Sequence, residues 1–363
     1  MKIAQIAPII ERVPPKKYGG TERVVHALTE ELVKRGHEVT LFASGDSLTS
    51  AKLVSVYPKS LREAKLKDIY GINTWSLHNI GLAYDMQDEF DIIHDHTGYF
   101  GLTLAQIART PTLITLHGPI NRENRHIFER FRKPYLATIS NAQSLPAPGL
   151  NYAGMVYNGL PMENYPFSAE HDGYLLFVGR ITAEKGVHHA IEVAQDLNLP
   201  LIIAAKLEPI DTPYFKEYVE PSLNEQIRWI GEVNEEERNA LYSRAMAFLH
   251  PVTWREPFGL TLIEAMASGC PVVAFNRGSI PELVVHGKTG YVVNDVDEMI
   301  DALSTINSID RKECRKHVLE NFSASIMADG YEKLYKKILK NVRTTNDHST
   351  QRVVFETRSR HDS

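Results

Sequence analysis

Short apolar runs alternate with helical patterns along the first half of the chain. Residues 3–7 predict a buried strand, and residues 21–35 predict a helix because apolar side chains recur on one of its faces. Gly36, just past this pattern, suits the end of a helix. The low alternation within the runs suits a parallel sheet covered on both faces. Further strands are predicted at residues 39–43, 91–94, 112–116, 135–139 and 155–157.

The second half repeats this order from residue 174. A cluster of Gly, Pro and Asp residues at 158–172 marks the joint. Two successive strand–helix series predict an α/β protein with two doubly wound, Rossmann-like domains that face a cleft. We place the domains at residues 1–160 and 161–324, expect the final helix at 325–340 to pack back on the first domain, and expect a disordered tail at 341–363. Strands are predicted at 174–178, 201–205, 227–230, 247–250, 271–274 and 291–293, and helices at 187–197, 235–244 and 260–267.

Composition narrows the class of protein. The 363 residues are 43% hydrophobic and 23% charged, which is ordinary for a globular protein. The formal net charge of −5 argues against a general nucleic-acid binder. Cys270 and Cys314 form neither a metal-ligand spacing nor a disulfide framework, which suits a reducing compartment. The first apolar run is too short for a signal peptide, so we expect a cytoplasmic protein.

The richest chemistry lies in the segment from Arg255 to Glu264. Glu256 and Glu264 are eight positions apart, which corresponds to about 12 Å along a helix axis. Paired glycosidase carboxylates lie about 5–9.5 Å apart, so these two suit the ends of one elongated ligand better than a single bond. A helix start between them offers N–H groups that favour a phosphate. A sugar, a diphosphate and a ribose together describe a nucleotide-sugar.

Two cations and two glycines add to this site. Arg180 and Lys185 follow the strand that opens the second domain, where ligands of open α/β sheets bind. Both suit the oxygens of a leaving diphosphate, whose negative charge grows as the sugar bond breaks. Gly19 and Gly20, between the first strand and the first helix, let the backbone approach a ligand closely.

Together, the segments at residues 19–20, 179–186 and 256–274 resemble the retaining glycosyltransferases of family four, which have the GT-B fold. The resemblance extends from Lys2 to about Lys340. It implies that Glu264 binds ribose hydroxyls, that Glu256 binds the donor sugar, and that His117 contacts that sugar from the first domain. It also implies that backbone N–H groups of the donor loop bind sugar and phosphates, from Phe258, Gly259, Leu260 and Thr261.

Two segments depart from this pattern or add to it. Family members often carry Gly-Gly before Pro-Glu, whereas this chain has Ser279 before Ile280, Pro281 and Glu282, which weakens a donor role for that loop. The segment 122–133 is basic and amphipathic and suits either peripheral contact with an anionic membrane or a solvated helix. Its two glutamates dilute the charge and favour the solvated helix.

The resulting hypothesis is a metal-independent hexosyltransferase without a cofactor. It would move a hexose from UDP-hexose or GDP-mannose to a hydroxyl of a glycan, glycolipid or small glycoside, with retention. The alternatives are a nucleotide-sugar epimerase or inverting enzyme, a non-catalytic nucleotide-sugar-binding protein, and a metal-dependent hydrolase using His94, His96 and His117. No acidic or Cys cluster completes a metal site around His94 and His96. The other interpretations are contact of His96 with the sugar or the acceptor, and plain strand-end packing.

Overall fold

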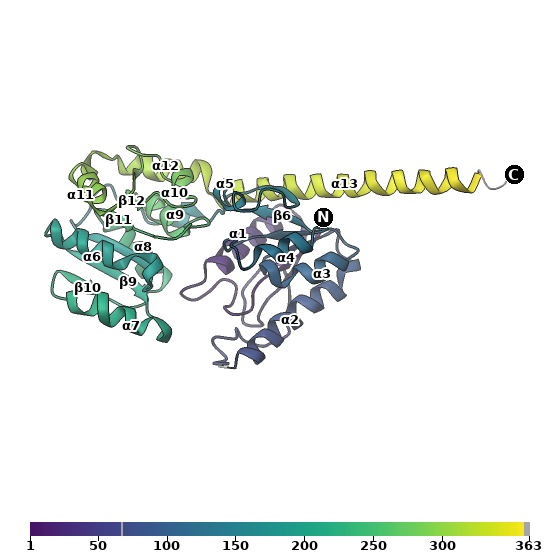
Figure 1. Cartoon of the computed structure of the whole chain (residues 1–363), viewed down its shortest axis with the longest axis horizontal. Coiled ribbons are helices and arrows are strands. Elements are labelled where there is room, and N and C mark those ends of the chain that lie inside the picture. Colours follow the sequence, from purple (N-terminus) through teal and green to yellow (C-terminus); the bar gives the residue numbers. More distant parts are fainter. Residues whose placement is uncertain (67, 359–363) are drawn as a thin grey trace.

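The computed structural model describes residues 1–66 and 68–358 and contains two parallel β-sheets, each flanked by helices (Figure 1). The first sheet has the order β3-β2-β1-β4-β5-β6-β7, and all its paired strands run parallel. The chain switches direction of winding between β1 and β4, where doubly wound sheets bind ligands. Its strands are β1 (Lys2–Ile6), β2 (Glu38–Phe42), β3 (Lys52–Val54), β4 (Ile92–Asp95), β5 (Thr112–Thr115), β6 (Tyr135–Thr138) and β7 (Tyr152–Met155).

The second sheet has the order β10-β9-β8-β11-β12-β13 and is also parallel. Its switch point lies between β8 and β11. The prediction of two doubly wound α/β domains is therefore confirmed. The strands are β8 (Leu175–Arg180), β9 (Leu201–Lys206), β10 (Ile227–Trp229), β11 (Ala247–His250), β12 (Val272–Phe275) and β13 (Gly290–Val293).

At the start of several helices, a side chain accepts a hydrogen bond from a backbone N–H group that has no partner within the helix. Asn234 and Glu237 form a reciprocal capping box at α8, and Asp295 accepts a hydrogen bond from the N–H of Glu298 at α11. The helices are α1 (Gly20–Lys34), α2 (Ile69–Asp85), α3 (Leu102–Ile107), α4 (Arg125–Arg130), α5 (Asn141–Ser144), α6 (Val187–Asp196), α7 (Thr212–Tyr214), α8 (Glu235–Arg244), α9 (Leu260–Ala267), α10 (Ile280–Leu283), α11 (Val296–Ser304), α12 (Arg311–Asn321) and α13 (Ala324–Arg358).

The chain crosses between the two sheets twice, and the crossings lie side by side. The N–H of Leu160 donates to the carbonyl of Phe322 (3.1 Å), and the N–H of Ala324 donates to the carbonyl of Leu160 (2.9 Å). A Cβ added at Gly159 would lie 2.2 Å from the carbonyl oxygen of Ser323, so only glycine fits there. The crossing strands are thereby held together at the joint.

After the second crossing, α13 packs on the first sheet. Its Glu332 accepts a hydrogen bond from His37 (2.6 Å), and its Lys337 donates to the carbonyl of Ala153 (2.7 Å). The helix then continues to Arg358, extending away from both sheets (Figure 1). The structure thus differs from the disordered tail expected at 341–363: residues 341–358 are helical, since neither Gly nor Pro interrupts them, and 359–363 lie outside the described residues.

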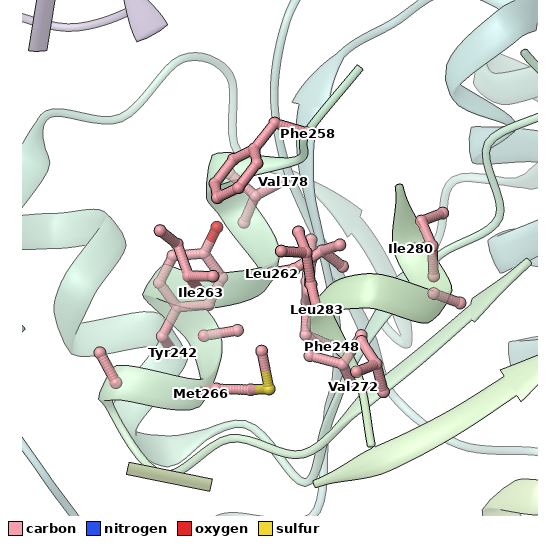
Figure 2. Close-up of a cluster of buried hydrophobic side chains, with 14 of the residues drawn as sticks. Val178, Tyr242, Phe248, Phe258, Leu262, Ile263, Met266, Val272, Ile280 and Leu283 are labelled. Atoms are coloured by element: carbon pink, nitrogen blue, oxygen red, sulfur yellow. The ribbon is translucent and has the colours of Figure 1, made fainter. Parts of the chain in front are cut away.

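The buried side chains of helix α9 pack within an apolar cluster (Figure 2). Leu262, Ile263 and Met266 are fully buried, in a cluster that also contains the strand residues Phe248 and Val272. A helix anchored in this way presents its start, and the residues before it, in a fixed position. No described helix is long and apolar enough to cross a membrane.

The basic segment forms only the short helix α4. Arg125 Nε donates to Glu129 Oε1 (2.6 Å), Arg132 Nη1 donates to the carbonyl of Gly149 (3.1 Å), and Lys133 Nζ donates to that of Ala108 (2.5 Å). These three side chains are hydrogen-bonded to neighbouring residues, which favours the solvated helix over membrane contact.

Candidate functional site

A cleft of about 450 Å³ lies between the carboxyl ends of the two sheets. Loops after β1, β5, β8 and β11 line it, as expected from the two switch points. The structure brings together every residue that the sequence predicted for the site: His117, Arg180, Lys185, Glu256, Gly19, Gly20, Phe258, Gly259, Leu260, Thr261 and Glu264.

Lys185 and Glu256 form an ion pair in this cleft. Lys185 Nζ lies 2.7 Å from Glu256 Oε2, which also accepts a hydrogen bond from Trp254 Nε1 (3.0 Å). The ammonium lies 4.9 Å from the centre of the Trp254 ring, a cation–π distance. Burial would raise the pKa of Glu256, but Lys185 and His250 lower it to about 2. Glu256 is therefore an ionised acceptor.

Glu264 is bound differently and faces other partners. Its Oε1 accepts a hydrogen bond from Tyr165 (3.0 Å), lies 3.1 Å from Arg238 Nη2 and forms an ion pair with Arg23. Arg23 comes from α1 in the first half of the chain, and Arg238 from α8 in the second. Burial would raise the pKa of Glu264, but the two guanidinium groups lower it. These contacts all use Oε1, which leaves Oε2 for a ligand hydroxyl.

The start of α9 lies between these two carboxylates in sequence. Gly259, with φ of +97°, precedes the helix, and Leu260 and Thr261 are its first residues. Their N–H groups have no partner within the helix, so they are available to an anion or a hydroxyl. A Cβ added at Gly20 would lie 3.2 Å from Leu260 Cδ1, so the two halves approach each other closely here.

Arg180 supplies an unpaired donor. Its Nη2 donates to Glu184 Oε1 (3.1 Å), but its buried Nε has no hydrogen-bond partner among the described residues. A buried N–H without a partner is costly. An oxygen of a bound phosphate would satisfy it.

His117 reaches the cleft, whereas His94 and His96 lie beneath it. Both are buried, and neither lines the cleft. His96 Nδ1 lies 2.9 Å from His117 Nε2, and His94 Nε2 lies 2.7 Å from the Thr115 hydroxyl. Strand-end packing is thus the interpretation that the geometry supports for His94 and His96. No cluster of three or more metal-ligating side chains occurs among the described residues.

The loop that departs from the usual pattern supports the donor loop from outside the cleft. The buried hydroxyl of Ser279 donates to the carbonyl of Phe258 (2.6 Å) and lies 3.1 Å from that of Glu256. Glu282 accepts hydrogen bonds from the N–H groups of Asn141 and Ala142, at the start of α5 (2.8 Å each). Ser279 and Glu282 therefore act on the backbone and do not line the cleft.

Sequence reasoning missed several charged residues of the cleft, among them Glu22, Arg23, Lys206 and Arg238. Lys206 ends β9, so its strand-end position was an available signal. Glu22 follows the glycine pair in the first turn of α1. No sequence spacing predicts Arg23 and Arg238, because they are far from Glu264 in the sequence and contact it only in the folded protein.

Comparisons with known proteins identify the family of this chain. The family model described as glycosyltransferase family 4 matches residues 18–145, and that described as glycosyl transferases group 1 matches residues 164–321. The O-antigen chain mannosyltransferase C of Escherichia coli is 22% identical over 90% of this chain and 96% of its own length.

Two solved structures have the same fold. AviGT4, a glycosyltransferase involved in avilamycin A biosynthesis, has a TM-score of 0.71 with 23% identity, over 94% of this chain and 98% of its own. Anabaena Alr3699/HepE, in complex with UDP and glucose, has a TM-score of 0.71 with 18% identity, over 93% of this chain and 100% of its own. The chain therefore belongs to the family-four type of glycosyltransferases and has the GT-B fold.

Proposed function

We propose that this glycosyltransferase moves a hexose from a nucleoside diphosphate sugar to an acceptor hydroxyl, with retention of anomeric configuration. The observation that carries the proposal is the convergence of two ionised carboxylates, a helix start and two cations in one cleft. In this proposal Glu264 Oε2 binds the ribose, the N–H groups of Leu260 and Thr261 bind phosphate, and Glu256 binds the sugar.

Arg180 and Lys185 stabilise the leaving group. As the bond between the anomeric carbon and the phosphate oxygen breaks, its electron pair goes to the diphosphate, where the two cations offset the growing charge. The acceptor oxygen bonds to the anomeric carbon on the same face, and its proton goes to a leaving phosphate oxygen. Same-face attack is taken from the family resemblance. Because protein cations supply the charge, we propose that the reaction needs no metal.

For the donor we propose UDP-hexose or GDP-mannose. The E. coli relative is named a mannosyltransferase, and HepE was solved with UDP and glucose. A nucleotide-sugar has a charged centre and hydroxyl-rich ends, which matches the cations and carboxylates of the cleft. The acceptor would be a glycan, a glycolipid or a small glycoside.

A thermal-shift screen of nucleotide-sugars tests donor binding, because a ligand that binds only the native state raises the melting temperature. We expect one donor to give a selective rise. A flat response to UDP- and GDP-linked sugars would contradict the proposed donor class.

The donor so identified is then incubated with an acceptor panel, with and without EDTA, and the product is examined by proton NMR. Transfer with the donor's anomeric configuration, undiminished by EDTA, is expected. An inverted product would indicate an inverting enzyme, a modified donor without transfer an epimerase, and binding without turnover a sensor. Each of these outcomes would contradict the proposal.

A further inference from the structure

A chain of buried hydrogen bonds runs beneath the cleft and ends at His117. Gln5 Oε1 lies 2.7 Å from His96 Nε2, and His96 Nδ1 lies 2.9 Å from His117 Nε2. Gln5 and His96 are buried and do not line the cleft. We propose that Gln5 and His96 are positioning residues that fix the tautomer of His117, so that its Nδ1 presents a lone pair to a hydroxyl of the bound sugar.

The orientation of the Gln5 amide determines which nitrogen of His96 carries a hydrogen. Its Nε2 lies 3.3 Å from the hydroxyl of Tyr335 and 3.5 Å from His94 Nδ1, which turns its oxygen toward His96. An amide oxygen only accepts, so His96 Nε2 must carry a hydrogen. His94 Nδ1 in turn lies 2.6 Å from the Tyr335 hydroxyl, so the amide nitrogen of Gln5 faces two atoms that can each accept a hydrogen bond.

The charge state of the two rings determines where their remaining hydrogens lie. Burial lowers the pKa of His96 well below its ordinary value and lowers the pKa of His117 to about 4, so both imidazoles are neutral at pH 7. A neutral imidazole has one N–H and one lone pair. With its hydrogen on Nε2, His96 has a lone pair on Nδ1 and accepts from His117 Nε2–H. The remaining nitrogen of His117, Nδ1, then has no hydrogen.

Nδ1 of His117 is free to meet a ligand. This atom makes no hydrogen bond to a described residue, and it is not fully enclosed by protein atoms. His117 itself lines the cleft. A lone pair at this position selects a group that donates. A sugar hydroxyl donates, whereas a phosphate oxygen, a carbonyl or a fluorine does not. The assignment of the hydroxyl to a sugar rests on the proposed function; the tautomer does not.

The tautomer can be read directly from long-range ¹⁵N–¹H spectra of the full chain labelled at histidine, at pH 7 and without ligand. Signals are assigned by loss in His117→Gln and His96→Gln. We expect His96 and His117 both as neutral Nε2–H tautomers. A hydrogen on Nδ1 of His117, or a doubly protonated ring, would overturn the proposal, since the opposite orientation of the Gln5 amide reverses every donor in the chain.

Two variants test whether Gln5 determines the tautomer of His117. Gln5→Leu removes the acceptor, so His117 should become a mixture of tautomers. Thr115→Val is the matched control, because it removes a partner of His94 and leaves the contacts from Gln5 to His117 in place. An unchanged His117 signal in a folded Gln5→Leu would show that Gln5 does not act in this way. If Gln5→Leu does not fold, the wild-type spectrum decides alone.

Kinetics test the ligand separately. Among donors with one hydroxyl replaced by fluorine, one position should lose about tenfold or more in kcat/KM with the wild type and much less with His117→Ala. Equal losses in both enzymes at every position would exclude the sugar as the partner of Nδ1. Absence of transfer with any donor would instead contradict the proposed function and leave the spectroscopic result standing.

Discussion

Lys185 Nζ lies 2.7 Å from Glu256 Oε2, so the proposed phosphate-binding cation and the proposed sugar-binding carboxylate support each other before any ligand binds. Removing either leaves the other buried without its charge partner. Lys185→Ala and Glu256→Ala should therefore each lower kcat at saturating donor by about 100-fold or more. Far-UV circular dichroism should show an intact fold.

The double variant provides the control for this pair. Its loss of activity should be smaller than the product of the two single losses, because the residues act through one contact. Wild-type turnover in either folded single variant would contradict the assigned roles.

Glu22 gives a prediction about pH. This residue is 6% exposed, and burial raises the pKa of its carboxyl from 4.5 to about 7. The folded protein thus holds this proton more tightly than the unfolded chain does. Its contribution to stability is complete below pH 4.5 and is lost as the pH rises through 7.

Relative to Glu22→Gln, the free energy of unfolding of the wild type should fall by up to about 3 kcal/mol between pH 4.5 and 8. Urea unfolding of both proteins across this range provides the measurement. A constant difference would show that the folded carboxyl titrates normally.

Arg23 and Arg238 form a matched pair for testing contact between the two halves. Both bind Glu264 Oε1, but only Arg23 reaches it from the other half of the chain. Each change to Met should lower the free energy of unfolding by about 1–3 kcal/mol, less than a fully unpaired buried charge would cost, since one guanidinium remains.

Only Arg23→Met should also enlarge the ligand-free radius of gyration in small-angle X-ray scattering, because it removes an ion pair across the cleft. Identical scattering from both variants would mean that this ion pair does not hold the halves together.

Ser279 should affect both stability and activity although it does not line the cleft. Ser279→Ala leaves the buried carbonyl of Phe258 without its hydroxyl partner, so we expect a loss of about 1–2 kcal/mol in stability and a lower kcat/KM for the donor. Ser268→Ala is the control, since the buried Ser268 hydroxyl has no partner among the described residues. It should change stability by less than about 0.5 kcal/mol. Equal effects of the two changes would argue against support of the donor loop.

The sequence predicted most of the fold because the strands are buried on both faces. The bounds of α8 and α9 agree with the expected 235–244 and 260–267. Helix α2 was missed, since only Asn79, Ile80, Ala83 and Tyr84 are buried along its 17 residues and no apolar stripe marks it. The strand expected at 155–157 lies three residues earlier, at β7.

The site was predictable where neighbours in sequence are neighbours in space. The loop before α9 carries Glu256 and its glycine, so the pattern alone placed them together. The partners of Glu264 come from α1 and α8, and no spacing rule connects them. The Ser279 contact was likewise hidden, because a hydroxyl on a backbone carbonyl leaves no recognisable spacing in the sequence.

The return of α13 to the first sheet has a practical consequence for engineering. Tyr331 and Tyr335 of this helix contact Thr115 and His94, in the layer under His117. A chimera that exchanges the second sheet and its helices between relatives must therefore be spliced twice, near Leu160 and again near Ser323. A single junction would import a foreign helix beneath the first sheet and disturb the packing under His117.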